Sequence, residues 1–327
     1  HLLKNDIKLR FAEQPFSVAG SSYAPGTLII TRKGNTHMGS KFDDIVKDAA
    51  KKYDRNLTST PTTFVETGKD FGSNGVPFLN APKILVLRGD GVSSLGFGEF
   101  WYFMEQELNY PITMVDVSDF GRIDLSKYNT LVLPSGSYGS ALSGNRMDDV
   151  KSWVRGGGKI IAIERSINTF AGKDGFSLKT YATDADEKEA NKKTDEQKEK
   201  EALTSYADRS DLFASSRLPG AIFKLKMDNT HPLGFGYPDY YFTLKNNSSR
   251  YAYLANGGNV GIIEGVDSYV SGVAGDKAKE RLAKSVVFGV EGYGRGAIVY
   301  MADNPLFRAF WQNGKLLVAN SIFFVGQ

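Results

Sequence analysis

The sequence contains no cysteine among its 327 residues. Disulfides, thiolate metal ligands and every mechanism that needs a sulfur nucleophile are therefore excluded. Histidine is also scarce. Its three residues form no His-x-x-Glu or His-x-x-x-His pattern of the kind that binds zinc. We therefore expect no metal site and no other cofactor in this chain.

Long apolar runs and a strong net charge are missing as well. No apolar stretch approaches the roughly 18–20 residues of a membrane-spanning helix. Lys and Arg number 40 against 37 Asp and Glu, which gives a net charge of only +3. We therefore expect neither a membrane span nor a nucleic-acid partner. Apolar residues make up 41% of the chain, which is enough for a sizeable buried core.

A change of pattern near residue 81 divides the chain into two predicted domains. Residues 1–80 combine a strand and a helix and are predicted to form a small α+β domain. Residues 81–327 alternate short apolar strands with helices, which predicts an α/β fold with a doubly wound, mostly parallel sheet of flavodoxin-like type. The strands are expected at 83–88, 112–117, 130–133, 159–163, 221–226, 251–254, 260–263 and 297–301, and the helices at 99–108, 146–154 and 316–323.

A charged segment near residues 183–203 interrupts this alternation. It is rich in Asp, Glu and Lys and has almost no apolar residues. Such a segment cannot bury a hydrophobic face, so we expect a solvated surface insertion.

The first candidate site is the glycine-rich turn that contains Gly89 and Gly91, between a predicted strand and a predicted helix. This context suits a dinucleotide-binding loop, but Ser94 stands where the third glycine of that motif belongs. A tight turn also requires glycine. Turn geometry is therefore the favoured interpretation, with nucleotide binding as the alternative.

The second candidate site joins the turn Pro134-Ser135-Gly136 to the strand that follows Gly156-Gly-Gly-Lys159 and ends at Glu164. This order resembles the class I glutamine amidotransferase fold. In that family the turn supplies oxyanion-hole amides and the strand ends in a strained elbow that carries a catalytic Cys. Glu164 falls at the elbow position, and a carboxylate cannot form the thioester. The resemblance therefore implies a degenerate site.

Two other interpretations of these segments stay open. Ser137 or Ser166 could act with His231 in a small-molecule hydrolase, although His231 is followed by Pro232 and lacks the family's His-x-acid pattern. Alternatively, the crevice is a binding site for a peptide or small polar ligand. Its residues would be Gly89, Gly91, Ser135, Gly136, Glu164 and Arg165.

Structural interpretations compete with these functional ones. Glu164 could form an internal ion pair with Arg88, at the end of another predicted strand. Near the end of the chain, Phe307, Phe310 and Trp311 have helical spacing, which predicts an apolar face against the core.

A second resemblance covers nearly the whole chain. The segments that carry it are Pro25-Gly-Thr-Leu-Ile-Ile-Thr-Arg32, Gly68-Lys-Asp-Phe-Gly-Ser73, Ala81-Pro-Lys-Ile-Leu-Val-Leu87, Leu95-Gly-Phe-Gly-Glu-Phe-Trp101, Asn229-Thr-His-Pro-Leu-Gly-Phe-Gly-Tyr237 and Asp303-Asn-Pro-Leu-Phe-Arg-Ala-Phe-Trp311. In this order they resemble the C-terminal region of secreted zinc carboxypeptidase-family proteins of the Bacteroidetes type, in which a metallopeptidase domain precedes an amidotransferase-like module.

The resemblance implies that this chain is a non-catalytic accessory module and a fragment of a longer protein. Zinc would be bound only in the upstream peptidase domain, which would be the natural partner of the chain. The implied location is periplasmic or extracellular.

Overall fold

The computed structural model describes residues 1–181, 199, 202–205 and 214–327. The predicted charged insertion at 183–203 lies almost entirely outside the described residues. The division into domains at residues 80 and 81 stays a prediction.

One mixed sheet of ten strands forms the centre of the molecule. Its parallel half has the order β14-β8-β7-β5-β6, and every pair of neighbours in it is parallel. Side chains of its three inner strands are almost completely buried, because the sheet is covered on both faces. The strands are β5 (Ile84–Arg88), β6 (Thr113–Asp116), β7 (Thr130–Leu133), β8 (Lys159–Ile163) and β14 (Gly296–Met301).

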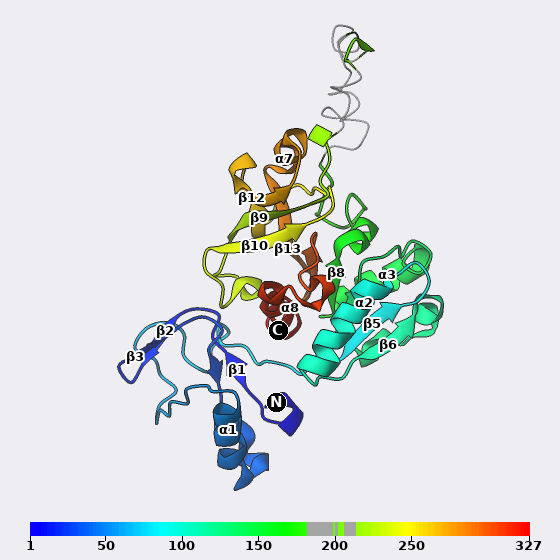
Figure 1. The fold of residues 1–327 in the computed structure, drawn as a ribbon. Coiled ribbons are helices and arrows are strands. Elements are labelled where there is room, and N and C mark those ends of the chain that lie inside the picture. The colour runs from blue at the N-terminus through cyan, green and yellow to red at the C-terminus, as the bar shows by residue number, and fades with distance from the viewer. Residues whose placement is uncertain (182–198, 200–201, 206–213) are drawn as a thin grey trace.

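An antiparallel half extends the sheet beyond β14 in the order β10-β9-β11-β13, with β12 paired to β9. In Figure 1 the antiparallel half lies above the parallel half, and α8 lies between the sheet and the N-terminal residues. The strands are β9 (Gly220–Met227), β10 (Tyr240–Lys245), β11 (Asn259–Ile263), β12 (Tyr269–Val273) and β13 (Ser285–Tyr293).

Helices cover the sheet and are short. The helix α2 contacts β5 and α3 contacts β14, while a π-helical segment, Tyr102–Glu107, continues α2. The helices of this part are α2 (Ser94–Trp101), α3 (Gly144–Arg155), α7 (Asp276–Leu282) and α8 (Lys315–Phe323). The α/β fold class predicted from the sequence is confirmed.

Residues 1–80 lie outside the sheet and pack against α8 (Figure 1). They contain two small antiparallel pairs, β1 with β4 and β2 with β3, and one helix. The Phe11 ring contacts Phe235 and Phe324, with centroids 6.5 and 4.9 Å away. The elements are β1 (Arg10–Phe11), β2 (Phe16–Val18), β3 (Ser21–Tyr23), β4 (Leu28–Ile29) and α1 (Lys41–Lys52).

A buried lysine holds the C-terminal end of α8 against the amino edge of the sheet. Lys159, at the start of β8, donates from Nζ to the carbonyl oxygens of Ile322 and Val325, 2.6 and 2.7 Å away. Cations are favoured at a helix C-terminus, where carbonyl groups lack intrahelical partners. Burial lowers the pKa of Lys159 to about 7.

Two expectations about elements need correction, and three strands were not expected. Residues 251–254 form no strand, since only Tyr251 makes bridges, to Thr180 and Val286. Phe307 starts a single 3-10 turn and Phe310 is 56% exposed, so no helical face packs against the core there. The sequence also gave no indication of β10, β12 or β13. Among the described residues, no helix is both long and apolar enough to cross a membrane.

Candidate functional site

Glu164 lies at the carboxyl end of β8, at a sharp turn into a short 3-10 helix, Glu164–Thr169. Its φ is +52°, in the left-handed region that L-residues with side chains disfavour. A strained strand-to-helix turn that exposes one side chain at the edge of a parallel sheet is the geometry of a nucleophile elbow. Residue 164 therefore has a left-handed backbone at a strand-to-helix turn, and its side chain is a carboxylate.

The turn Pro134-Ser135-Gly136, after β7, lies beside this elbow because β7 and β8 are neighbours. It is joined to the Gly89–Val92 loop: Ser93 N donates to Ser135 O at 2.8 Å, and Ser137 N donates to Gly91 O at 2.9 Å. A Cβ at Gly136 would lie only 2.9 Å from Gly91 O. The glycine at 136 therefore serves the close contact between the two loops.

The pKa of Glu164 is raised above its ordinary value. Burial is the main cause, opposed by a hydrogen bond from the Ser135 side chain and increased by the carboxylates of Asp303 and Glu99. Lys245 lowers it in turn. These groups come from the carboxyl ends of β7 and β14, from α2 and from β10, so they meet at the edge where open α/β sheets bind ligands.

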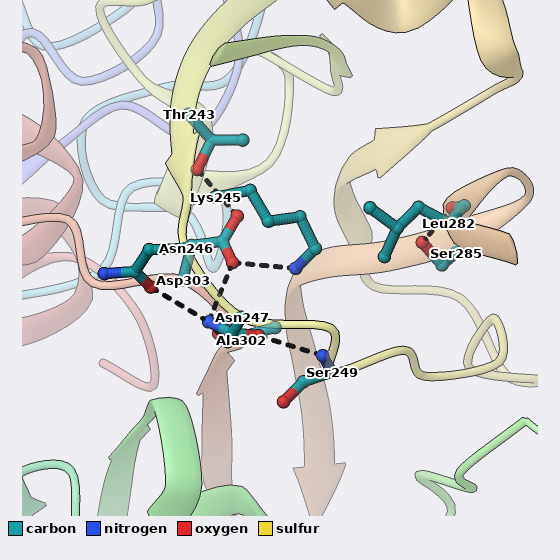
Figure 2. Close-up of polar contacts among 9 residues, drawn as sticks. All are labelled: Thr243, Lys245, Asn246, Asn247, Ser249, Leu282, Ser285, Ala302 and Asp303. Carbon is teal, nitrogen blue, oxygen red and sulfur yellow. Dashed lines mark hydrogen bonds and ion pairs between the residues drawn. The ribbon is translucent and has the colours of Figure 1, made fainter. Parts of the chain in front are cut away.

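Asp303 and Lys245 form a fully buried ion pair on the inner face of β10. Lys245 Nζ lies 2.8 Å from Asp303 Oδ1, and both side chains are 1% exposed. The Thr243 hydroxyl donates to Asp303 Oδ2 at 2.8 Å. Figure 2 shows both groups converging on the one carboxylate from the same strand. Because both of its oxygens accept hydrogen bonds from β10, Asp303 holds the segment after β14 against the antiparallel half of the sheet.

Glu99 performs a similar structural role from α2. Its Oε2 accepts from Asn304 Nδ2 and its Oε1 from Arg308 N, each at 2.6 Å. Arg308 has a φ of +50°, so the carboxylate bonds a backbone amide in a strained turn. Glu99 therefore fixes the 304–308 segment.

The structure does not bring the serine and histidine candidates together by hydrogen bonding. Ser166 is buried and donates from Oγ to Ile163 O at 2.9 Å. His231 follows β9, and its Nδ1 accepts from Leu233 N at 3.0 Å, capping a short 3-10 turn. Burial lowers the pKa of His231, opposed by Asp228. Within the described residues, His231 makes no hydrogen bond to Ser137 or Ser166.

The predicted ion pair between Glu164 and Arg88 is wrong. Arg88 Nε lies 3.6 Å from Asp116 Oδ1, because β5 pairs with β6 and with β7, whereas Glu164 follows β8. Arg165 is exposed. Gly89 has a φ of +94°, and a Cβ there would meet Asp116 Oδ1 at 2.7 Å. The packing of this loop thus accounts for its first glycine.

The predicted site residues, among them Glu164, Ser135 and Gly136, stay predictions. No sequence pattern indicated a site role for Glu99, Lys245 or Asp303, although Glu99 and Asp303 lie in segments that carry the second resemblance. These three residues are far apart in the chain. Their burial as charged residues becomes visible only in the structure. In the described part of the chain, no three His, Asp or Glu residues are placed to hold a metal ion.

Comparison with protein-family models and with curated proteins gives no match. Solved structures of similar fold include a ThuA-like protein from Parabacteroides merdae, with 13% identity over 74% of this chain and 89% of that one and a TM-score of 0.45. A ThuA-like protein from Bacteroides uniformis has 11% identity over 80% and 94%, with a TM-score of 0.42. A glutamine amidotransferase from Thermotoga maritima has 10% identity over 73% and 90%, with a TM-score of 0.37.

The expected likeness to amidotransferase-type α/β proteins is thus found among solved structures. At these identities it concerns the fold alone. None of these structures bears on a zinc carboxypeptidase parent.

Proposed function

We propose that this chain is a non-catalytic accessory module with a degenerate amidotransferase-like site. The observation that carries the proposal is Glu164 in a left-handed elbow at the end of β8, in a chain without cysteine. The backbone that would present a nucleophile is retained, and the residue it presents cannot form a thioester.

The surroundings of Glu164 also disfavour a substitute nucleophile. A serine nucleophile needs a base within hydrogen-bond reach of its hydroxyl. The Ser166 hydroxyl bonds to the backbone of its own turn, and the His231 Nδ1 caps another. Charge repulsion from Asp303 and Glu99 makes the site unfavourable for a developing oxyanion.

The parent protein in this proposal is an exported zinc carboxypeptidase-like protein. Its support is the ordered set of six sequence segments that resemble that family. The module would contact an upstream peptidase domain, which alone would bind zinc, in the periplasm or outside the cell. A reading frame upstream that encodes a His-x-x-Glu pair and a distant His would support this parent, and one that encodes an unrelated protein would contradict it.

Ligand binding at the same crevice is the second candidate function. It is favoured by one observation: a half-buried carboxylate with a raised pKa bonded to Ser135 at the carboxyl edge of the sheet. The ligand would be a peptide or a small polar molecule with donor groups.

The proposal is tested by measuring ammonia release from glutamine, hydrolysis of a p-nitrophenyl ester and zinc content of the purified chain. Wild type and Glu164→Ala should both hydrolyse at the buffer rate, and zinc should be far below one ion per chain. Turnover by wild type that Glu164→Ala abolishes would overturn the non-catalytic assignment.

The second candidate needs its own measurement. A panel of amino acids and dipeptides is titrated against the chain by calorimetry. Binding that Glu164→Ala abolishes, and that the exposed-site control Glu280→Ala retains, would support a ligand crevice. Equal loss in both variants, or no binding by any of the panel, would contradict it.

A further inference from the structure

A cavity lies between residues 1–80 and α8, away from Glu164. Its volume is about 480 Å³, within the roughly 300–1,000 Å³ of small-molecule sites. Three walls enclose it: the N-terminal segment with β4, the helix α1 with the residues that follow it, and one face of α8.

The walls of the cavity are almost entirely apolar. Leu3, Leu9 and Ile30 form one side, Val46 and Ala49 another, and Ala319 and Phe323 of α8 close it together with Phe324, which follows the helix. Four large apolar side chains that line it are also exposed: Leu28 by 45%, Tyr53 by 48%, Leu57 by 53% and Leu316 by 42%. Exposed apolar side chains gathered around a concave site indicate a surface that something apolar covers.

The polar residues that line this cavity are His1, Arg55, Asn56 and Asn320, of which Arg55 has a permanent positive charge. Arg55 lines it, no Asp or Glu is among its described lining residues, and Lys52 Nζ lies 5.3 Å from the Tyr53 ring centroid. Arg55 Nε donates to Tyr53 O at 2.8 Å. Within the described residues no carboxylate pairs with Arg55, so its guanidinium can bind an anion from outside the chain.

We propose that this cavity binds a single-chain amphiphile with an anionic head, such as a medium-chain fatty acid. The alkyl chain lies between α1 and α8, and the carboxylate lies at Arg55. The apolar walls supply most of the affinity and the guanidinium sets the orientation. This site is independent of the proposed degenerate site at Glu164.

Octanoate, decanoate and dodecanoate are titrated calorimetrically against the full chain, below their micelle concentrations. Each methylene added within the cavity should tighten binding on the order of four-fold. Saturable binding of one ligand per chain with this trend is the expected result. No saturable binding, or affinity that does not change with chain length, would overturn the proposal.

Two variants locate the ligand. Ala50→Phe places a ring in the cavity and should abolish dodecanoate binding. Arg55→Gln, at an exposed position that does not threaten the fold, should weaken binding several-fold while the dependence on chain length persists. Leu95→Ala, at a 70% exposed apolar site outside the lining, is the control and should bind as wild type does.

Other occupants give different outcomes, and each contradicts the proposal. A dimer in light scattering that Ala50→Phe converts to monomer would assign the cavity to a second copy of the chain. Sedimentation with anionic phospholipid vesicles, without binding of free dodecanoate, would assign it to a membrane surface. Equal loss of binding in Arg55→Gln and Leu95→Ala would show that the anion does not bind at Arg55.

Discussion

At the scale of single residues, Glu164 carries two unfavourable features at once. Its backbone is left-handed, and its carboxylate is partly buried beside Asp303 and Glu99. Strain and perturbed pKa values at one position are typical of functional sites. Under the proposed function, these features belong to a nucleophile elbow whose side chain is a carboxylate that performs no nucleophilic chemistry.

The raised pKa predicts how Glu164→Gln changes stability with pH. A group whose pKa is higher in the folded state contributes stability below its unfolded pKa, and that contribution is lost as pH rises through the folded pKa. Glutamine does not titrate. The variant should therefore unfold at a higher temperature than wild type at pH 8. This difference in unfolding temperature should decrease toward pH 4. Thermal unfolding across this range checks it, and a difference that does not depend on pH would contradict it.

The buried ion pair predicts a large loss of stability for Asp303→Ala. The substitution leaves Lys245 buried without its carboxylate, which costs about 3–5 kcal/mol in such sites. Lys245→Met combined with Asp303→Leu should recover much of that loss. Urea unfolding measures all three proteins. A loss below about 1 kcal/mol for Asp303→Ala would show that Lys245 finds another partner.

The sequence predicted candidate site residues at Glu164 and in the turn Pro134-Ser135-Gly136, because each follows a strand that is a continuous apolar run. Asp303 could not be assigned in this way, since its partner Lys245 is 58 positions away and on a strand that the sequence did not predict. Charged residues are usually solvated, so sequence alone favours a surface position for both.

At the scale of elements, the parallel strands were predictable and most antiparallel ones were not. β7 and β8 were predicted at their observed bounds, because all their side chains are buried and, after the first residue of each strand, apolar. β10 contains alternating exposed and buried residues that include Thr243 and Lys245. Because polar residues lie on its buried face, β10 does not show the alternation of apolar and polar residues that predicts a strand from sequence.

The contact between β8 and α8 predicts a second pH effect. The pKa of Lys159 is depressed to about 7 in the folded state from an ordinary value of 10.5. The unfolded chain therefore binds more protons between these values, and stability from this group rises with pH from about 7 to 10. Lys159→Met removes the titration. The free energy of unfolding of wild type minus that of the variant should therefore become more positive as pH rises.

Urea unfolding at pH 7 and pH 9.5 measures this difference. Lys33→Met, at an exposed lysine, is the control and should show no comparable change. A difference between wild type and Lys159→Met that stays constant with pH would contradict the account of Lys159.

At the scale of the whole molecule, residues 1–80 are coupled to the α/β part through an aromatic cluster. Phe11 is fully buried and contacts Phe235 and Phe324. The same junction holds the proposed fatty-acid cavity, so the packing of the N-terminal part determines the shape of that site.

Phe11→Ala should therefore lower the free energy of unfolding by about 3–5 kcal/mol, as for other buried Phe residues. Phe64→Ala, at a 75% exposed site in the same part of the chain, should change it by less than about 0.5 kcal/mol. Urea unfolding of both variants checks this. Similar losses in the two would show that the aromatic cluster does not couple the parts.

The central claim is that residue 164 occupies a nucleophile elbow from which the nucleophile is missing. The most direct test is the difference in unfolding free energy between Glu164→Gly and Glu164→Ala, since both remove the carboxylate and only alanine retains a Cβ. With φ at +52°, the glycine variant should be the more stable by about 1 kcal/mol. At Glu280, in the helix α7, the same pair should show the reverse order. If alanine is equal to glycine or more stable at position 164, there is no elbow and the degenerate site is excluded.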